Sequence, residues 1–250
     1  MGAKVKPVAD PVAEGQRAVE AAADQGVPLR ALGGVAVAML CPSARRPPLA
    51  RSHADIDLAT TKAARDQVVG FLETLGYAAD EEFNILHGHR RLCFWDERAG
   101  RQVDVFVEEA NLCHRIALGR RLEAVPLTLS PADLTVLKLQ VVETNEKDYL
   151  DLCAIFADQE LTADDSGINL PYIVELASTN WGLWRTLGMV AERSEQFALE
   201  LPGFESGGAV AGKLQRLRAE LESAPKSRAW KLRARIGDRK RWYELPEEVK

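Results

Sequence analysis

Three aspartates in two short segments are the residues of this chain best suited to chemistry. Asp55 and Asp57 lie two residues apart in DIDLAT, and Asp104 stands between valines in RQVDVFVE. Residues i and i+2 of a strand project from the same face, so Asp55 and Asp57 are expected close together. Like charges at that separation repel, and a divalent cation would offset the repulsion. A third aspartate on a second strand of the same sheet would complete a site for one or two Mg²⁺ ions, which bridge triphosphate oxygens.

A simpler interpretation of each feature leaves the carboxylates merely solvated. A D-x-D pair is common on surface strands, and an acid between valines points away from them, where it can meet water. Paired glycines, Gly33 and Gly34, precede Asp55 by about twenty residues. They would let the backbone approach a phosphate, with the next helix supplying amide donors. This order of glycine turn, D-x-D strand and later aspartate favours a functional site.

The elements that must position these residues form a small mixed sheet with helices over residues 26–110. Strands are expected at DIDLAT, RRLCFWD and RQVDVFVE, the last two joined by the turn ERAG. The other segments preceding Asp104 are expected to be helical or irregular: a helix over 11–25 with Pro11 at its start, a short helix VAVAML, a loop CPSARRPPLARSHA and a helix over 62–75.

After residue 126 the pattern is that of a helical region. Ser130 is a suitable N-cap with Pro131 at the first helical position, and KDYLDLCAIFAD follows. Further amphipathic stretches lie around 169–179, 183–200 and 208–223. Lys138 falls on an otherwise apolar helical face, from which it either snorkels to solvent or reaches a cleft. Asp148 and Asp151 share one helical face, and Asp148 is also a favourable charge near a helix N-terminus.

Composition excludes several classes of protein. The formal net charge is −5 over 250 residues, which argues against nucleic-acid binding over the whole surface. The four cysteines form no C-x-x-C pair and are expected as free buried thiols, and the histidines show no metal-ligand spacing. The first residues, polar and interrupted by proline, do not resemble a signal peptide, and no membrane span is expected. We therefore expect a cytoplasmic protein.

The last part of the chain carries a contrasting charge. Residues 213–250 contain twelve Lys and Arg against six acids, a formal +6 beside −11 for the rest. Trp230, Trp242 and Tyr243 are interleaved with these basic residues. Such a mixture can bind nucleic acid by phosphate pairing and base stacking. The alternative is a terminal helix that packs its aromatic side chains and keeps its charges in water.

Glycines followed by R-x-x-x-D-I-D-L, beginning at Arg51, and then by V-D-V-F resemble the polymerase-beta-type nucleotidyltransferase superfamily. The resemblance is closer to its AbiEii-type toxin and minimal nucleotidyltransferase branch, and it extends through LKLQVVETNEKDYLDL to about residue 156. It implies an α+β fold, with a small mixed-sheet nucleotidyltransferase core and a helical C-terminal region. The corresponding divisions are an N-terminal helix (1–25), the core (26–125) and a helical domain (126–250).

The resemblance also implies roles for particular residues. Asp55, Asp57 and Asp104 would bind Mg²⁺, and Asp104 would also be the candidate base for an attacking hydroxyl. The residues implied to bind the nucleoside triphosphate are Gly33, Gly34, Arg51 and Lys138. Asp148 and Asp151 would lie near the site. Arg51, Arg90 and Arg91 are arginines that either meet phosphate or stay solvated.

The activity implied is the metal-dependent transfer of a nucleotidyl group from a nucleoside triphosphate to a hydroxyl acceptor, in RNA or protein. The branch also implies a toxin with a cognate antitoxin as partner. One departure favours an alternative. Many active members have Ser directly after the first glycine of the turn, where this chain has Gly34 and then Val35. The alternative is an inert nucleotide-binding or regulatory protein of the same fold.

Overall fold

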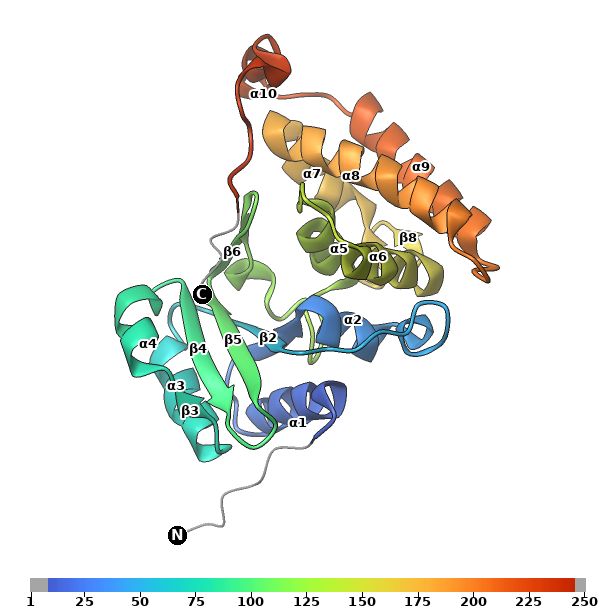
Figure 1. Ribbon diagram of the computed structural model, residues 1–250. Helices are drawn as coiled ribbons and strands as arrows, with labels where there is room; N and C mark the ends of the chain where they lie inside the picture. The colour runs from blue at the N-terminus through green and yellow to red at the C-terminus, as the bar shows by residue number, and fades with distance from the viewer. Residues whose placement is uncertain (1–8, 246–250) are drawn as a thin grey trace. The chain divides into compact units, whose positions relative to one another are not determined.

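The computed structural model describes residues 9–245, which form two compact units (Figure 1). We call residues 9–40, 52–110 and 116–130 the sheet unit, and residues 41–51, 111–115 and 131–245 the helical unit. These bounds differ from the three predicted divisions. Helix α1 (Pro11–Asp24) is part of the sheet unit because its apolar face is buried there, and the loop 41–51 belongs to the helical unit. Residues 1–8 of the first predicted division lie outside the described residues.

The sheet unit is built on five strands in the order β1-β2-β5-β4-β3. Strand β2 runs parallel to β5, and the other neighbours are antiparallel, so the sheet is mixed. The strands are β1 (Leu29–Leu32), β2 (Ile56–Thr60), β3 (Ala78–Ala79), β4 (Arg91–Asp96) and β5 (Arg101–Val107). The predicted strands and the β4–β5 hairpin at ERAG are confirmed, and Figure 1 shows these two strands side by side.

Alternation along the strands gives the sheet one apolar and one partly polar face. Val103, Val105 and Val107 are fully buried, and their cross-strand partners on β2 and β4 are buried as well. Side chains of the intervening residues, Asp104 among them, project from the other face. Burial of the apolar face fixes the register, because a slip of one residue would exchange the two faces.

Four helices complete the sheet unit. Helix α1 is capped by Asp10, and α2 (Gly33–Leu40) and α3 (Arg65–Thr74) match predicted helices. Gly15 lets α1 approach closely, since a Cβ there would lie 2.6 Å from Val35 Cγ1. Helix α4 (Glu81–His87), capped by Asp80, was not predicted because all its residues are at least partly exposed and give no apolar stripe.

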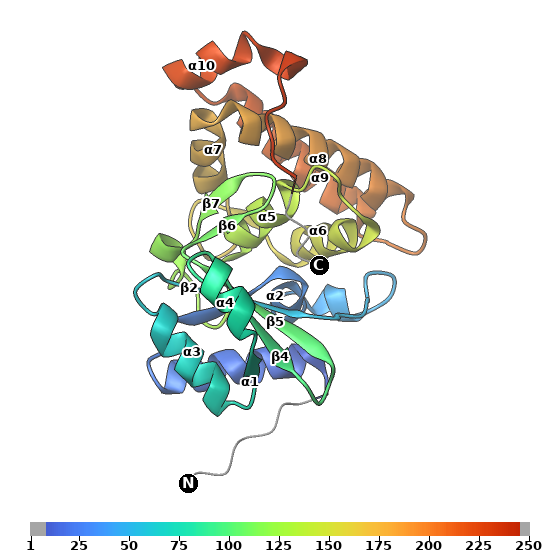
Figure 2. The ribbon, with the colours of Figure 1, turned by 60° about the vertical axis from the view of Figure 1, so that its left-hand side comes forward.

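The helical unit contains the remaining helices of the described residues. Both Figure 1 and Figure 2 show α8 and α9 side by side. The helices are α5 (Pro131–Leu139), α6 (Glu146–Asp158), α7 (Leu170–Thr179), α8 (Trp181–Glu200), α9 (Gly207–Ser223) and α10 (Arg228–Ala234). Short strands β8 (Leu161–Thr162) and β9 (Ile168–Asn169) pair in parallel. Strands β6 (Glu109–Asn111) and β7 (Arg115–Ala117) form a separate two-stranded sheet, and some of their residues belong to the sheet unit.

The structure confirms the α+β class, a small mixed sheet followed by a helical region. All four cysteines are free and buried, as predicted, and burial raises the pKa of Cys41 and of Cys153 to about 12. Among residues 9–245, none of the helices is both long enough and apolar enough to cross a membrane.

Candidate functional site

The partly polar face of the sheet brings two of the three predicted metal ligands together. Asp57 on β2 and Asp104 on β5 are directly paired in the parallel register, so their side chains leave the same face. Asp55 lies two residues before Asp57, just ahead of the strand, and is exposed. Asp104 is only 3% exposed, whereas Asp57 is partly exposed. The β2–β5 register thus places Asp57 and Asp104 side by side, with Asp55 at the residue before β2.

Gly33 borders this pair of strands at the start of α2. Its φ is +67°, a left-handed conformation that favours glycine, and a Cβ there would collide with the Asp57 carboxylate. Leu32 of β1 is the register partner of Asp57, which explains the close approach. The predicted glycine turn and the D-x-D strand are thus neighbours in space.

Asp104 is held by two side chains that the sequence analysis did not place in the site. Arg91 on β4 donates from Nε at 3.0 Å and from Nη2 at 2.5 Å, one bond to each carboxylate oxygen. Gln102 Nε2, two residues before Asp104 on the same strand face, lies 3.1 and 3.0 Å from the two oxygens. The Arg91 guanidinium also lies over the ring of its cross-strand partner Phe106, 5.4 Å from the centroid.

The charges around Arg91 favour its protonated form. Burial alone would lower the pKa of Arg91, but the hydrogen bonds and charge of Asp104, together with the charge of Asp57, raise it above its ordinary value. The guanidinium is therefore a permanent cation between two carboxylates. The Arg91 side chain is 28% exposed, so it is partly accessible to solvent.

The donor chemistry of this face suits a hard cation, but its geometry is only partly arranged for one. Carboxylate oxygens are ligands that Mg²⁺ prefers, and the glycine backbone against Asp57 leaves no side chain in the way. In residues 9–245, however, no three acidic, histidine or cysteine side chains converge as metal ligands do. Asp104 is instead turned to Arg91 and Gln102. Asp55, Asp57 and Asp104 are the residues that would hold such a cation, and Asp104 would do so only after Arg91 moved.

The other predicted residues meet in the helical unit as an ion-pair cluster. Arg51 donates to both oxygens of Asp151, at 2.8 and 2.7 Å. Lys138 Nζ lies 2.8 Å from an oxygen of Asp151 and 2.8 Å from one of Asp148. Asp148 also completes a capping box with Asn145 at the start of α6, as its position near a helix N-terminus predicted. We call Arg51, Lys138, Asp148 and Asp151 the helical cluster.

The pKa directions in the helical cluster follow from this pairing. Burial would lower the pKa of Lys138, but Asp151 and Asp148 outweigh it, so the pKa is raised. Burial would raise the pKa of Asp151, but Lys138 and Arg51 outweigh it, so the pKa is lowered. Lys138 and Asp151 are therefore charged near neutral pH, and the helical cluster pairs two basic side chains with two acidic ones.

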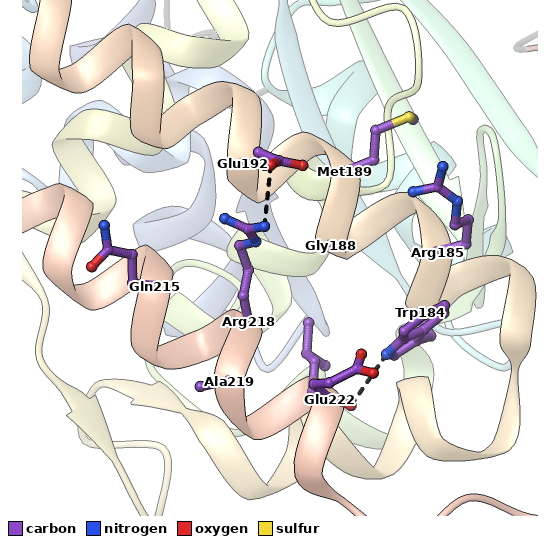
Figure 3. Close-up of a pocket in the computed structure, with 10 residues that line it drawn as sticks. Trp184, Arg185, Gly188, Met189, Glu192, Gln215, Arg218, Ala219 and Glu222 are labelled. Atoms are coloured by element: carbon purple, nitrogen blue, oxygen red, sulfur yellow. Dashed lines mark hydrogen bonds and ion pairs between the residues drawn. The ribbon is translucent and has the colours of Figure 1, made fainter.

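A groove of about 450 Å³ between α8 and α9 has polar walls whose groups are paired with one another (Figure 3). Arg218 on α9 forms ion pairs with Glu192 and Glu195 of α8, and Trp184 Nε1 donates to the Leu221 carbonyl. No residue predicted from the sequence as a site residue lines this groove.

The aromatic residues of the basic segment are packed within the helical unit. Trp230 meets Trp184 edge to face with centroids 5.1 Å apart, and Trp242 meets Trp181 in the same way. Trp242 Nε1 also donates to Thr186 Oγ1 at 3.0 Å. These contacts favour the interpretation in which the aromatic side chains stabilise the unit and the basic side chains stay in water.

Sequence reasoning missed the participation of Arg91 and Gln102. Arg91 was noted only as an arginine that either meets phosphate or stays solvated. A signal was present in the strand pattern: Gln102, Asp104 and Phe106 alternate with valines, and Arg91 begins the preceding strand of a hairpin. The length of the turn sets the register of the hairpin. That register places Arg91 opposite Phe106 and hence next to Asp104.

The chain was compared with known proteins. No protein-family model and no curated protein matches its sequence. Among solved structures, a crystal structure of a provisionally assigned nucleotidyltransferase from H. pylori is similar over 84% of this chain and 95% of that chain. The identity is 13% and the TM-score 0.37. A likeness at this level carries no argument, so a nucleotidyltransferase function is a proposal that rests on the residues of this chain.

Proposed function

We propose that the chain is a nucleotidyltransferase that uses a divalent cation to transfer a nucleotidyl group from a nucleoside triphosphate to a hydroxyl acceptor. One observation carries the proposal: Asp57 and Asp104 are register partners on adjacent strands, with the Asp57 carboxylate against the backbone of Gly33. A backbone free of a side chain beside a carboxylate pair is what a triphosphate with its cation requires.

In the proposed reaction the acceptor hydroxyl attacks the α-phosphorus in line, and pyrophosphate leaves. Mg²⁺ would neutralise charge on the triphosphate and lower the pKa of the attacking hydroxyl. Asp55 and Asp57 would hold it, and Gly33 and Gly34 would let the backbone approach the phosphates. Asp104, released from Arg91, would complete the carboxylate set and accept the hydroxyl proton.

Only the class of the acceptor, RNA or protein, is proposed. A toxin role with a cognate antitoxin is proposed as well, and it rests on the resemblance in sequence. Expression in a bacterial host would test that role: a toxin would arrest growth, and Asp57→Ala would relieve the arrest. Nucleotide binding by Arg51 and Lys138 also remains a prediction, since both are engaged in the helical cluster.

The test of the proposed activity is transfer of label. Wild-type protein would be incubated with Mg²⁺, each α-labelled triphosphate and total RNA or cell extract, beside the Asp55→Ala/Asp57→Ala variant. We expect label on an acceptor with the wild type alone. Asp24→Asn, a change at the exposed last residue of α1, is a matched control that should leave transfer unchanged.

A second candidate is an inert nucleotide-binding protein of the same fold. The bidentate Arg91–Asp104 pair and the glycine in place of serine after Gly33 favour it. Calorimetry separates the two candidates. Triphosphate binding that needs Mg²⁺ and Asp57, without any transfer of label, would support the inert protein. Absence of such binding would contradict both.

A further inference from the structure

The Asp104 carboxylate has no lone pair left for another ligand. A carboxylate offers about four lone-pair positions, and Asp104 accepts two contacts from Arg91 and two from Gln102. A divalent cation that uses Asp104 must therefore replace one of these donors. Arg91 is the one it must replace, because two cations on one carboxylate repel each other, whereas the neutral Gln102 does not.

The surroundings of Arg91 allow such a movement. The Arg91 side chain is partly exposed, and its guanidinium also contacts the Phe106 ring, 5.4 Å from the centroid. The planar fork that now binds a carboxylate in bidentate fashion binds a phosphate equally well. A triphosphate at this face would therefore offer the displaced guanidinium a new anion, and a metal ion alone would not.

The formal charge of the face points the same way. Arg91 forms an ion pair with Asp104, and the charge of Asp57 also acts on its guanidinium. With Arg91 on Asp104, the face still attracts a cation, but its best-buried carboxylate is closed to that cation. In the free protein, Arg91 thus compensates the charge of Asp104, as a divalent cation would when the site is occupied.

We infer that Arg91 makes divalent-cation binding depend on the triphosphate: it occupies Asp104 in the free protein and exchanges that carboxylate for phosphate when both ligands arrive. This inference rests on the proposed function, because it assigns a positioning role at the same site. In the absence of nucleotide, Arg91 would therefore keep a metal ion from binding to Asp104.

The experiment measures bound Mn²⁺ by electron paramagnetic resonance, with the full chain, alone and with each of the four α,β-methylene triphosphate analogues. The variants are Arg91→Met, Arg91→Lys, Asp57→Asn and the control Arg98→Met, whose arginine is exposed in the turn between β4 and β5. We expect wild type to bind Mn²⁺ at least tenfold more tightly when an analogue is present, by analogy with usual coupling energies (about tenfold to a hundredfold).

In Arg91→Met, Mn²⁺ alone should bind about tenfold more tightly than in wild type, and the analogue should add little. Arg91→Lys, which keeps a charge but not the fork, should lie between them and covers the case in which Met impairs folding. Equal Mn²⁺ affinities and equal coupling in wild type, Arg98→Met and both Arg91 variants would overturn the inference while leaving the function intact. If wild type binds no Mn²⁺ with any analogue, or Asp57→Asn binds it as well, the proposed function itself fails.

Discussion

The two ionic clusters of this protein differ in their balance of charge. The helical cluster pairs two cations with two carboxylates, and Lys138 and Asp151 are each shared between two partners. The sheet face carries Asp55, Asp57 and Asp104, and Asp104 pairs with Arg91. Removing one partner from a balanced buried cluster costs stability, whereas neighbouring like charges favour a ligand that compensates them. This difference supports placing the proposed ligand at the sheet face and a structural role in the helical cluster.

The largest expected effect follows from removing charge at the sheet face. Asp57→Asn should reduce transfer of label by about a thousandfold or more, the scale of losing one essential electrostatic contact in the transition state. The free energy of unfolding should change by about 1 kcal/mol or less, since Asp57 is partly exposed. Transfer assays and urea unfolding on the same sample would measure both. A large loss of stability with retained transfer would contradict the assignment of a ligand-binding role to the sheet face.

The matching change in the helical cluster should act on stability. Asp151→Ala leaves Lys138 and Arg51 without their shared carboxylate, so we expect a loss of about 3–5 kcal/mol in the free energy of unfolding. Asp148→Asn, where the carboxylate is less buried, should cost about 1 kcal/mol or less. Urea titration would measure both. Weakened triphosphate binding by Lys138→Met at unchanged stability would instead place the cluster in the nucleotide site.

The helical unit should also be sensitive to acid through His114. Burial lowers the pKa of His114 to about 4, and its Nε2 lies 2.8 Å from Thr186 Oγ1. Its pKa in the unfolded chain is near 6.5. Between these values the unfolded state binds the extra proton, so stability is present above pH 6.5 and falls as the pH drops toward 4. The loss is on the order of 3 kcal/mol. His114→Gln should flatten this dependence in urea unfolding from pH 4 to 8, and His89→Gln, at an exposed residue, should not.

The smallest expected effect is that of a change at Gly33, the glycine beside Asp57. Gly33→Ala should cost about 1–2 kcal/mol, because alanine is strained at positive φ and its Cβ displaces the Asp57 carboxylate. Gly70→Ala, in α3 where nothing lies within 4 Å, should stabilise by about 0.5–1 kcal/mol. Thermal unfolding would compare them. Cation binding should weaken only in Gly33→Ala. An equal weakening of cation binding in both variants would show that Gly33 has no role in the site.

Local sequence determined most of the elements. Alternation along DIDLAT and RQVDVFVE predicts strands with the aspartates opposite the buried valines, and Pro131 marks the start of α5 that the structure shows. Such signals lie within one turn or one strand and need no knowledge of distant residues. The short, exposed helix α4 gave no such signal and was missed.

Only the tertiary structure decided which charged groups meet. Arg51 and Asp151 are a hundred residues apart in the chain, yet they form a bidentate pair within the helical unit. Arg91 reaches Asp104 through the register of a hairpin, and Asp57 reaches it through a parallel pairing with residues 61–100 in between. The sequence by itself named the carboxylates, because residue type and spacing on one strand suffice for that. Their partners depend on strand order and register, which burial of the valine face fixes only when the whole sheet has formed.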